Sequence, residues 1–111
     1  MALPTPPRAH QEFIERFPGI RAAWEQLTEA GKDGPLDEKT RRLVKFALAA
    51  GSLREGAVHA AVRKARAIGV TLAELEQIIA LAAPTIGLPA AVAVYTWLHD
   101  LQPEGAGDPQ T

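Results

Sequence analysis

Two side chains capable of acid–base chemistry, Glu55 and His59, stand one helical turn apart in the middle of this 111-residue chain. An i, i+4 spacing places both on the same face of a helix. An imidazole titrates near neutral pH, so a carboxylate that orients it can make it a general base. Alternatively, the two belong to a solvated polar line that Arg63 and Arg66 continue along the same helix. Both interpretations stay open at this point.

Two arginines near this segment, Arg42 and Arg54, could hold an anionic substrate. A guanidinium group binds a carboxylate through two parallel hydrogen bonds. The same arginines could instead form ion pairs with the neighbouring acids Glu38 and Glu55. We predict Arg42 and Arg54 as substrate-binding residues, with local ion pairing as the alternative.

Other kinds of site find little support in the residue types. The chain has no cysteine, which excludes disulfides, thiolate metal ligands and thiol redox chemistry by its own residues. Its histidines, His10, His59 and His99, lack the spacing of metal ligands, so neither a metal nor a cofactor is predicted. We expect His10 on the surface, and His99 to complement the dipole at the end of the last helix.

Charge and hydropathy argue against a nucleic acid or a membrane as a binding partner. The formal net charge is −1, with acidic and basic residues interspersed, so no nucleic-acid partner is expected. No apolar run approaches the roughly 20 residues that span a bilayer, and residues 1–8 lack the apolar centre of a signal peptide. We predict a cytoplasmic protein without a membrane partner.

The composition favours one all-α domain, because strong helix formers dominate the middle of the chain. We predict a flexible N-terminal arm at 1–8, a helical domain at 9–101 and a disordered tail at 102–111, which is rich in proline, glycine and polar residues. Six helices are expected: 9–17, 19–30, from Asp37 to about Gly51, 53–68, from Thr71 to Pro84, and from about Pro89 to Leu101.

Local signals mark several helix ends. Asp37 is expected to cap the third helix, Gly69 to end the fourth, and Thr71 with Glu74 to form a capping box on the fifth. Pro84 is expected to end that fifth helix.

Apolar faces are expected on most helices. The predicted stripes are Ile20, Trp24 and Leu27; Leu43, Phe46, Ala47 and Ala50, widened by Val44 and Leu48; Ala57, Ala61, Ala65 and Ile68; Leu75, Ile78, Ile79 and Ala82; and, on the last helix, both Val92, Tyr95, Leu98 and Val94, Trp97, Leu101. Trp24, Tyr95 and Trp97 are expected to pack in the core or in an interface. A small domain with so much apolar helix surface is expected to be a homo-oligomer.

Four sequence elements together resemble the carboxymuconolactone decarboxylase family, which includes the alkylhydroperoxidase D-like proteins. They are Phe17-Pro18, Leu36-Asp37 with Arg41-Arg42-Leu43-Val44, the run from Ala65 to Thr71 followed by Glu74, and Gly87-Leu88-Pro89-Ala90. The resemblance covers about Phe17 to Leu101. It implies a compact all-α bundle of about six helices, assembled as a trimer or hexamer with helical hairpins packed across subunits.

The functional residues of the family do not carry over. Counting back from Gly69, the glutamate of peroxidase members corresponds to Arg42, their two cysteines to Arg54 and Ala57, and their histidine to Ala61. A Cys-x-x-Cys mechanism needs an activated thiolate and a resolving thiol, so thiol peroxidase activity is disfavoured. The decarboxylase branch also places its histidine at Ala61. This chain instead has Glu55 and His59, in a segment that resembles one subgroup of the family.

Two hypotheses from different classes follow. The first is a carboxymuconolactone decarboxylase-like lyase, with cofactor-free acid–base chemistry on a small organic acid or lactone, His59 as base and Glu55 orienting it. The second is a non-catalytic oligomeric scaffold or small-ligand-binding protein. Burial of Glu55 and His59 together at a subunit interface would favour the first hypothesis, whereas exposure of both without a pocket would favour the second.

Overall fold

The computed structural model describes residues 8–100, and the regular structure in that range is entirely helical. Six helices follow one another: α1 (Arg8–Arg16), α2 (Pro18–Ala30), α3 (Glu38–Ser52), α4 (Glu55–Ala67), α5 (Leu72–Ile86) and α6 (Leu88–Asp100). The predicted all-α class and the six helices are confirmed. Leu101, the tail at 102–111 and all of the N-terminal arm except Arg8 lie outside the described residues.

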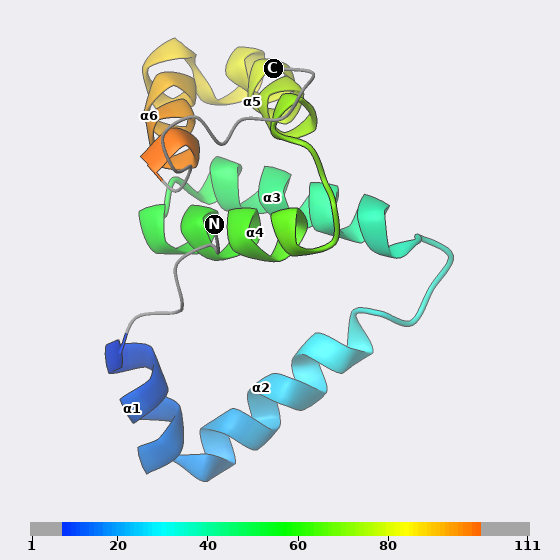
Figure 1. Cartoon of the computed structure of the whole chain (residues 1–111), viewed down its shortest axis with the longest axis vertical. Helices are drawn as coiled ribbons and strands as arrows, with labels where there is room; N and C mark the ends of the chain where they lie inside the picture. Colours follow the sequence, from blue (N-terminus) through cyan, green and yellow to red (C-terminus); the bar gives the residue numbers. More distant parts are fainter. Residues whose placement is uncertain (1–7, 101–111) are drawn as a thin grey trace.

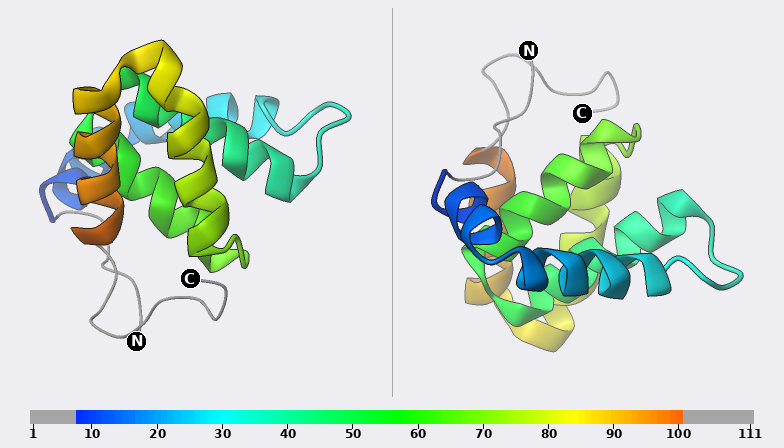
Figure 2. Two further views of the ribbon diagram at one scale, coloured as in Figure 1. Left: turned by 90° about the horizontal axis from the view of Figure 1, so that it is seen from above. Right: turned by 90° about the horizontal axis from the view of Figure 1, so that it is seen from below.

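Helices α3 to α6 form one packed bundle. The α3–α4 hairpin and the α5–α6 hairpin lie across each other as two layers, with α5 against α3 and α6 against α4 (Figures 1 and 2). The buried core comes entirely from this part of the chain: Phe46, Ala49, Ala50, Val58, Val62, Ala65, Val70, Leu72, Leu75, Ile79, Ala91, Val94 and Leu98. Every helix of the bundle therefore contributes its apolar stripe to a common interior.

The α1–α2 hairpin stands apart from the bundle (Figure 1). Its two helices contact each other, with the rings of Phe13 and Phe17 at a centroid distance of 5.3 Å, but they bury no residue. The stripe on α2 is confirmed as a stripe but not as part of the core, because Ile20, Trp24 and Leu27 are 47%, 59% and 66% exposed. None of the other helices within residues 8–100 buries it.

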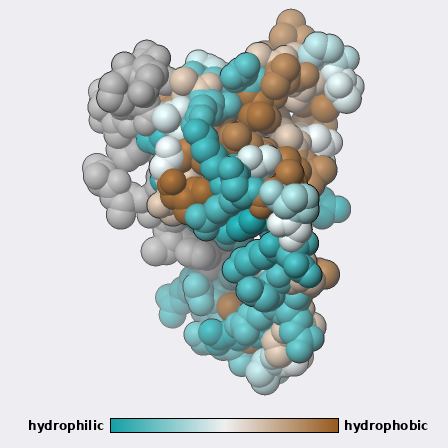
Figure 3. Space-filling view, turned by 90° about the vertical axis from the view of Figure 1, so that its right-hand side faces the viewer, coloured by the Kyte–Doolittle hydropathy of each residue, from teal (hydrophilic) through white to brown (hydrophobic). Residues whose placement is uncertain are grey.

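Part of the bundle surface is also apolar. In Figure 3, brown side chains gather over the bundle in the upper part of the view, whereas the α1–α2 hairpin below is mainly teal on this face. Large exposed apolar side chains of the bundle include Val44, Leu48, Leu81, Leu88, Val92 and Tyr95. The core of a single chain therefore leaves much apolar surface in contact with solvent.

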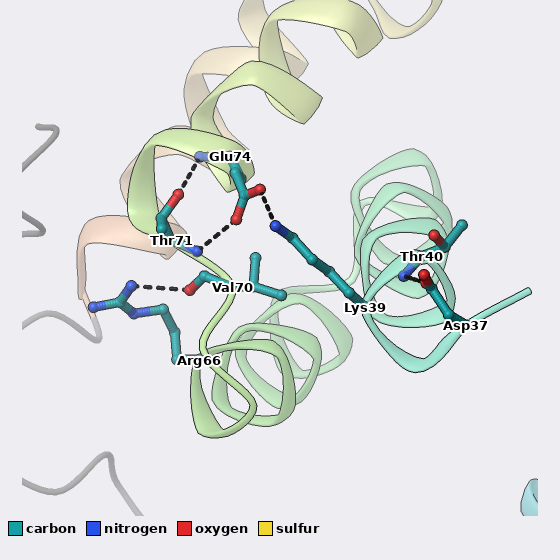
Figure 4. A network of polar contacts seen from close by, with 7 residues as sticks. All are labelled: Asp37, Lys39, Thr40, Arg66, Val70, Thr71 and Glu74. Atoms are coloured by element: carbon teal, nitrogen blue, oxygen red, sulfur yellow. Dashed lines mark hydrogen bonds and ion pairs between the residues drawn. The ribbon is translucent and has the colours of Figure 1, made fainter.

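The predicted caps are confirmed (Figure 4). The Asp37 carboxylate accepts a hydrogen bond of 2.8 Å from the backbone N–H of Thr40. At α5, the Thr71 hydroxyl accepts from the backbone N–H of Glu74, and the Glu74 carboxylate accepts from that of Thr71. Gly69 has a φ of 92°, which glycine adopts at little cost, and lets Val70 donate back to the Ala65 carbonyl after α4 ends.

The prediction that Pro84 ends the fifth helix is wrong, because α5 continues through Pro84 to Ile86. A proline removes one backbone donor, but this one lies within the last turn, where little helix remains to be broken. The helix ends instead at Gly87, whose φ is 92° and whose N–H donates to the Ala83 carbonyl at 2.8 Å.

Two predicted faces are confirmed only in part. On α4 the buried residues are Val58, Val62 and Ala65, whereas Ala57 and Ile68 of the predicted alanine face are exposed. On α6 the buried residues are Ala91, Val94 and Leu98, so Leu98 belongs to the stripe of Val94. Both helices present apolar residues in more than one direction, and the neighbouring helices determine which of them are buried.

Candidate functional site

The first turn of α4 presents Glu55 and His59 on one face, as their spacing predicts. Arg54 precedes the helix with an extended backbone, and Glu55 opens it, where a negative charge suits the helix dipole. The imidazole Nε2 of His59 lies 3.9 Å from the Glu55 carboxylate. This distance is longer than a hydrogen bond, so the two side chains are neighbours that are not hydrogen-bonded to each other.

The two members of this pair differ in burial. The His59 side chain is 22% exposed and the Glu55 side chain 57% exposed. The Nε2 atom of His59 is itself inaccessible to solvent, and it has no hydrogen-bond partner in the described part of the chain. A buried polar atom without a partner costs about 1–3 kcal/mol, and such atoms are uncommon in folded proteins. The site therefore holds an unsatisfied imidazole nitrogen beside an accessible carboxylate.

Asp100, at the end of α6, is a third member of this site that the sequence pattern does not reveal. One ligand atom from each of Glu55, His59 and Asp100 lies within 4.8 Å of the other two. The packing of α6 against α4 brings Asp100 there, and no spacing within one helix could indicate it. One imidazole and two carboxylates also make a donor set that a divalent metal accepts. The spacing of the histidines in the sequence could not predict this set, because two of its three members are carboxylates.

The two predicted substrate-binding arginines lie at different places. Arg54 adjoins Glu55 and is exposed. Arg42 lies ten residues before the end of α3 at Ser52, which is roughly 15 Å along the helix axis. The structure therefore does not bring Arg42 to the Glu55 end of the α3–α4 hairpin. Within the described residues, neither arginine forms an ion pair with Glu38 or Glu55, so the predicted alternative is not observed either.

A second carboxylate–imidazole pair, also not predicted, joins α5 to α6. The Nε2 atom of His99 lies 2.9 Å from the Glu76 carboxylate, and the ring of Tyr95 stands 4.3 Å from the imidazole. The helix dipole alone is therefore not a sufficient account of His99, whose side chain forms a direct tie between two helices. His10 is exposed, as expected.

Alanine occupies two positions at which the sequence comparison placed functional groups of the family: a cysteine at Ala57 and the histidine at Ala61. Ala57 is exposed, and Ala61 is half-buried against the core. Neither offers a group that could form a bond to substrate or pass on a proton. None of the described helices is both long and apolar enough to cross a membrane.

Comparison with known proteins gives one match. The family model described as the carboxymuconolactone decarboxylase family matches residues 18–100, which is most of the chain. No curated protein matches, and no solved structure does.

Proposed function

The chain belongs to the carboxymuconolactone decarboxylase family, and from that membership we propose cofactor-free acid–base chemistry on a small organic acid or lactone. His59 is the general base, and Glu55 is the carboxylate that orients it. The observation that carries the proposal is the buried Nε2 atom of His59, which has no hydrogen-bond partner among residues 8–100 and lies beside Glu55. An imidazole nitrogen that no described protein group uses can take a proton from a substrate, provided that the side chains enclosing it move aside when the substrate binds.

The chemistry follows from the charges around the imidazole. Removal of a proton next to a carbonyl or carboxyl group turns neutral His59 into an imidazolium ion. Glu55, at 3.9 Å, and Asp100 are the negative groups that would stabilise this cation. Arg54 adjoins Glu55 and is the arginine suited to hold the anionic end of the same substrate.

The alternative is a non-catalytic oligomeric scaffold or small-ligand-binding protein. Its support is the 57% exposure of Glu55, together with two hollows on α2, α3 and their connection that do not include Glu55 or His59. Thiol peroxidase activity stays disfavoured, because Arg54 and Ala57 occupy the positions of the two thiols.

We also propose that the protein is a homo-oligomer, as a trimer or hexamer, in which the α1–α2 hairpin packs on another subunit. Trp24 and Leu27 on α2, and Leu48 and Leu81 on the bundle, are each more than half exposed in the single chain. A second copy is the occupant that would cover both surfaces at once. A cytoplasmic location stays a prediction from the sequence.

The test is a screen of small lactones and carboxylic acids by NMR, with variants assayed on any substrate that is turned over. We expect His59→Ala to lower kcat/KM by about 10²-fold or more, the usual contribution of a general base, without changing the mass of the assembly. His10→Ala, which removes an exposed histidine on α1, is the matched control and should leave the rate unchanged. Full activity in His59→Ala would refute the role of His59. A screen without any turnover would leave the scaffold function in its place.

A further inference from the structure

Four cations gather on the α3–α4 hairpin, toward the end opposite Glu55. They are Arg42 and Lys45 from α3, with Arg63 and Lys64 from α4. Burial lowers the pKa of Lys64, and repulsion by Arg42, Lys45 and Arg63 lowers it further. Arg42 and Lys45 lie one turn apart on α3 and line the same hollow, and the α3–α4 packing places Arg63 near enough to join them in acting on Lys64.

The four cations of this face have no ion-pair partner among residues 8–100. Four cations elsewhere have acidic partners: Arg8 with Glu12, Arg21 with Glu25, Lys32 with Glu29 and Lys39 with Glu74. By contrast, none of the four cations forms an ion pair or a side-chain hydrogen bond with another described residue. A group of unpaired like charges destabilises the folded chain, and an external anion would relieve that cost.

A small hollow adjoins this face where α2 ends and α3 begins. Its volume is about 50 Å³, and its wall is formed by Thr28, Gly31, Lys32, Glu38, Arg41, Arg42 and Lys45. Cations outnumber the single carboxylate on this wall. The space exceeds the ~10–15 Å³ that one water molecule requires, so it can admit a small oxyanion group.

We propose that the face formed by Arg42, Lys45, Arg63 and Lys64 is a binding site for a small oxyanion with at least two negative charges. The ligand chemistry is that of a phosphate group or a polycarboxylate, which arginine contacts through paired N–H donors and lysine as a point charge. A nucleic acid fits less well, because the only aromatic residue of these two helices, Phe46, is fully buried. The proposal does not depend on chemistry at His59.

Calorimetric titration of the full chain at constant ionic strength tests the site, with pyrophosphate, citrate, a single-stranded oligonucleotide and chloride as probes. The double variant Arg42→Gln/Lys45→Gln should bind the preferred probe at least about tenfold more weakly, since each lost charge-assisted contact is worth about 1.5 kcal/mol or more. Arg8→Gln/Arg21→Gln is the matched control, because it changes the net charge equally but removes cations of α1 and α2 that already have partners. A preference for pyrophosphate or citrate distinguishes the two ligand classes.

Lysine side-chain NMR gives a second measurement that a purely structural role would not affect. A bound anion offsets the repulsion on Lys64, so its lowered pKa should rise when the probe is added. Four results would overturn the proposal: no saturable binding at millimolar probe, equal weakening in both double variants, an unchanged Lys64 pKa, or a clear preference for an oligonucleotide over pyrophosphate.

Discussion

The α1–α2 hairpin and the α3–α6 bundle are both helical, but they differ in what their apolar residues contact. Phe46, Val58, Leu75 and Leu98 of the bundle are fully buried, whereas α1 and α2 bury no residue. The bundle helices close around one another, but the α1–α2 hairpin has no comparable neighbour among the described residues. An apolar helix face thus indicates that another surface covers it. The face alone does not indicate whether that surface belongs to the same chain or to another subunit.

The site follows the same division. Glu55 and His59 come from α4 and Asp100 from α6, so the whole cluster lies on the bundle. Its supporting helices are held by the buried core, which is the rigid setting that acid–base groups need. The α1–α2 hairpin supplies none of these side chains. If its proposed role in assembly is correct, the two parts of the chain separate chemistry from association.

The largest expected difference between the two parts is in stability. Phe46→Ala should lower the free energy of unfolding by ~3–5 kcal/mol, because it removes a fully buried ring at the junction of α3 with the other helices. Chemical denaturation at several protein concentrations measures this loss, which should be similar at every concentration. Phe13→Ala on α1 is the matched control, since Phe13 is 49% exposed. An equal loss in both variants would contradict the division between the two parts.

The next effect concerns assembly. Light scattering after size exclusion should give the mass of a trimer or hexamer for the wild type. Trp24→Ser should reduce that mass, because burial of a large apolar side chain in the interface would contribute ~1.5–3 kcal/mol to the free energy of association. Its unfolding midpoint should then be lower and depend on protein concentration less strongly than that of the wild type, because a chain that assembles weakly gains little stability from mass action. Arg21→Gln, which changes an exposed charged residue on the same helix, should keep the wild-type mass. A wild-type protein with the mass of one chain would contradict the proposed assembly.

The smallest effects are those at helix ends. Thr71→Ala should cost ~1 kcal/mol by removing the cap of α5, whereas Arg21→Gln on α2 should cost about 0.5 kcal/mol or less, as exposed i, i+4 pairs usually do. Thermal unfolding of both variants measures the difference. A larger loss of stability for Arg21→Gln than for Thr71→Ala would show that the Arg21–Glu25 pair contributes more to α2 than the cap contributes to α5.

Acid should weaken the same cap. The ion pair with Lys39 and the hydrogen bond from the Thr71 amide hold the pKa of Glu74 below its ordinary value of 4.5. The contribution of Glu74 is therefore complete above the pKa of the unfolded chain and is lost as the pH falls through the lowered value of the folded state. Glu74→Gln should remove this part of the acid dependence, and an unchanged acid profile would contradict it.

Local features were predictable because their partners are close in the chain. The caps at Asp37 and Thr71 and the end of α4 at Gly69 each involve groups three to five residues apart, so the sequence determines them before any helix packs. The family, the all-α class and the absence of thiols were equally readable. The proximity of Glu55 to His59 also follows from one-turn spacing.

Features that involve two helices were not predictable in this way. Only packing decided that Val58 rather than Ala57 is buried, that Trp24 is left exposed, that Asp100 lies beside His59, and that His99 contacts Glu76. Helical periodicity reports which residues share a face, but burial depends on the position of a second helix, which a single segment does not encode. The sequence by itself thus determined the helices and one carboxylate–imidazole pair, and the tertiary structure determined what surrounds that pair.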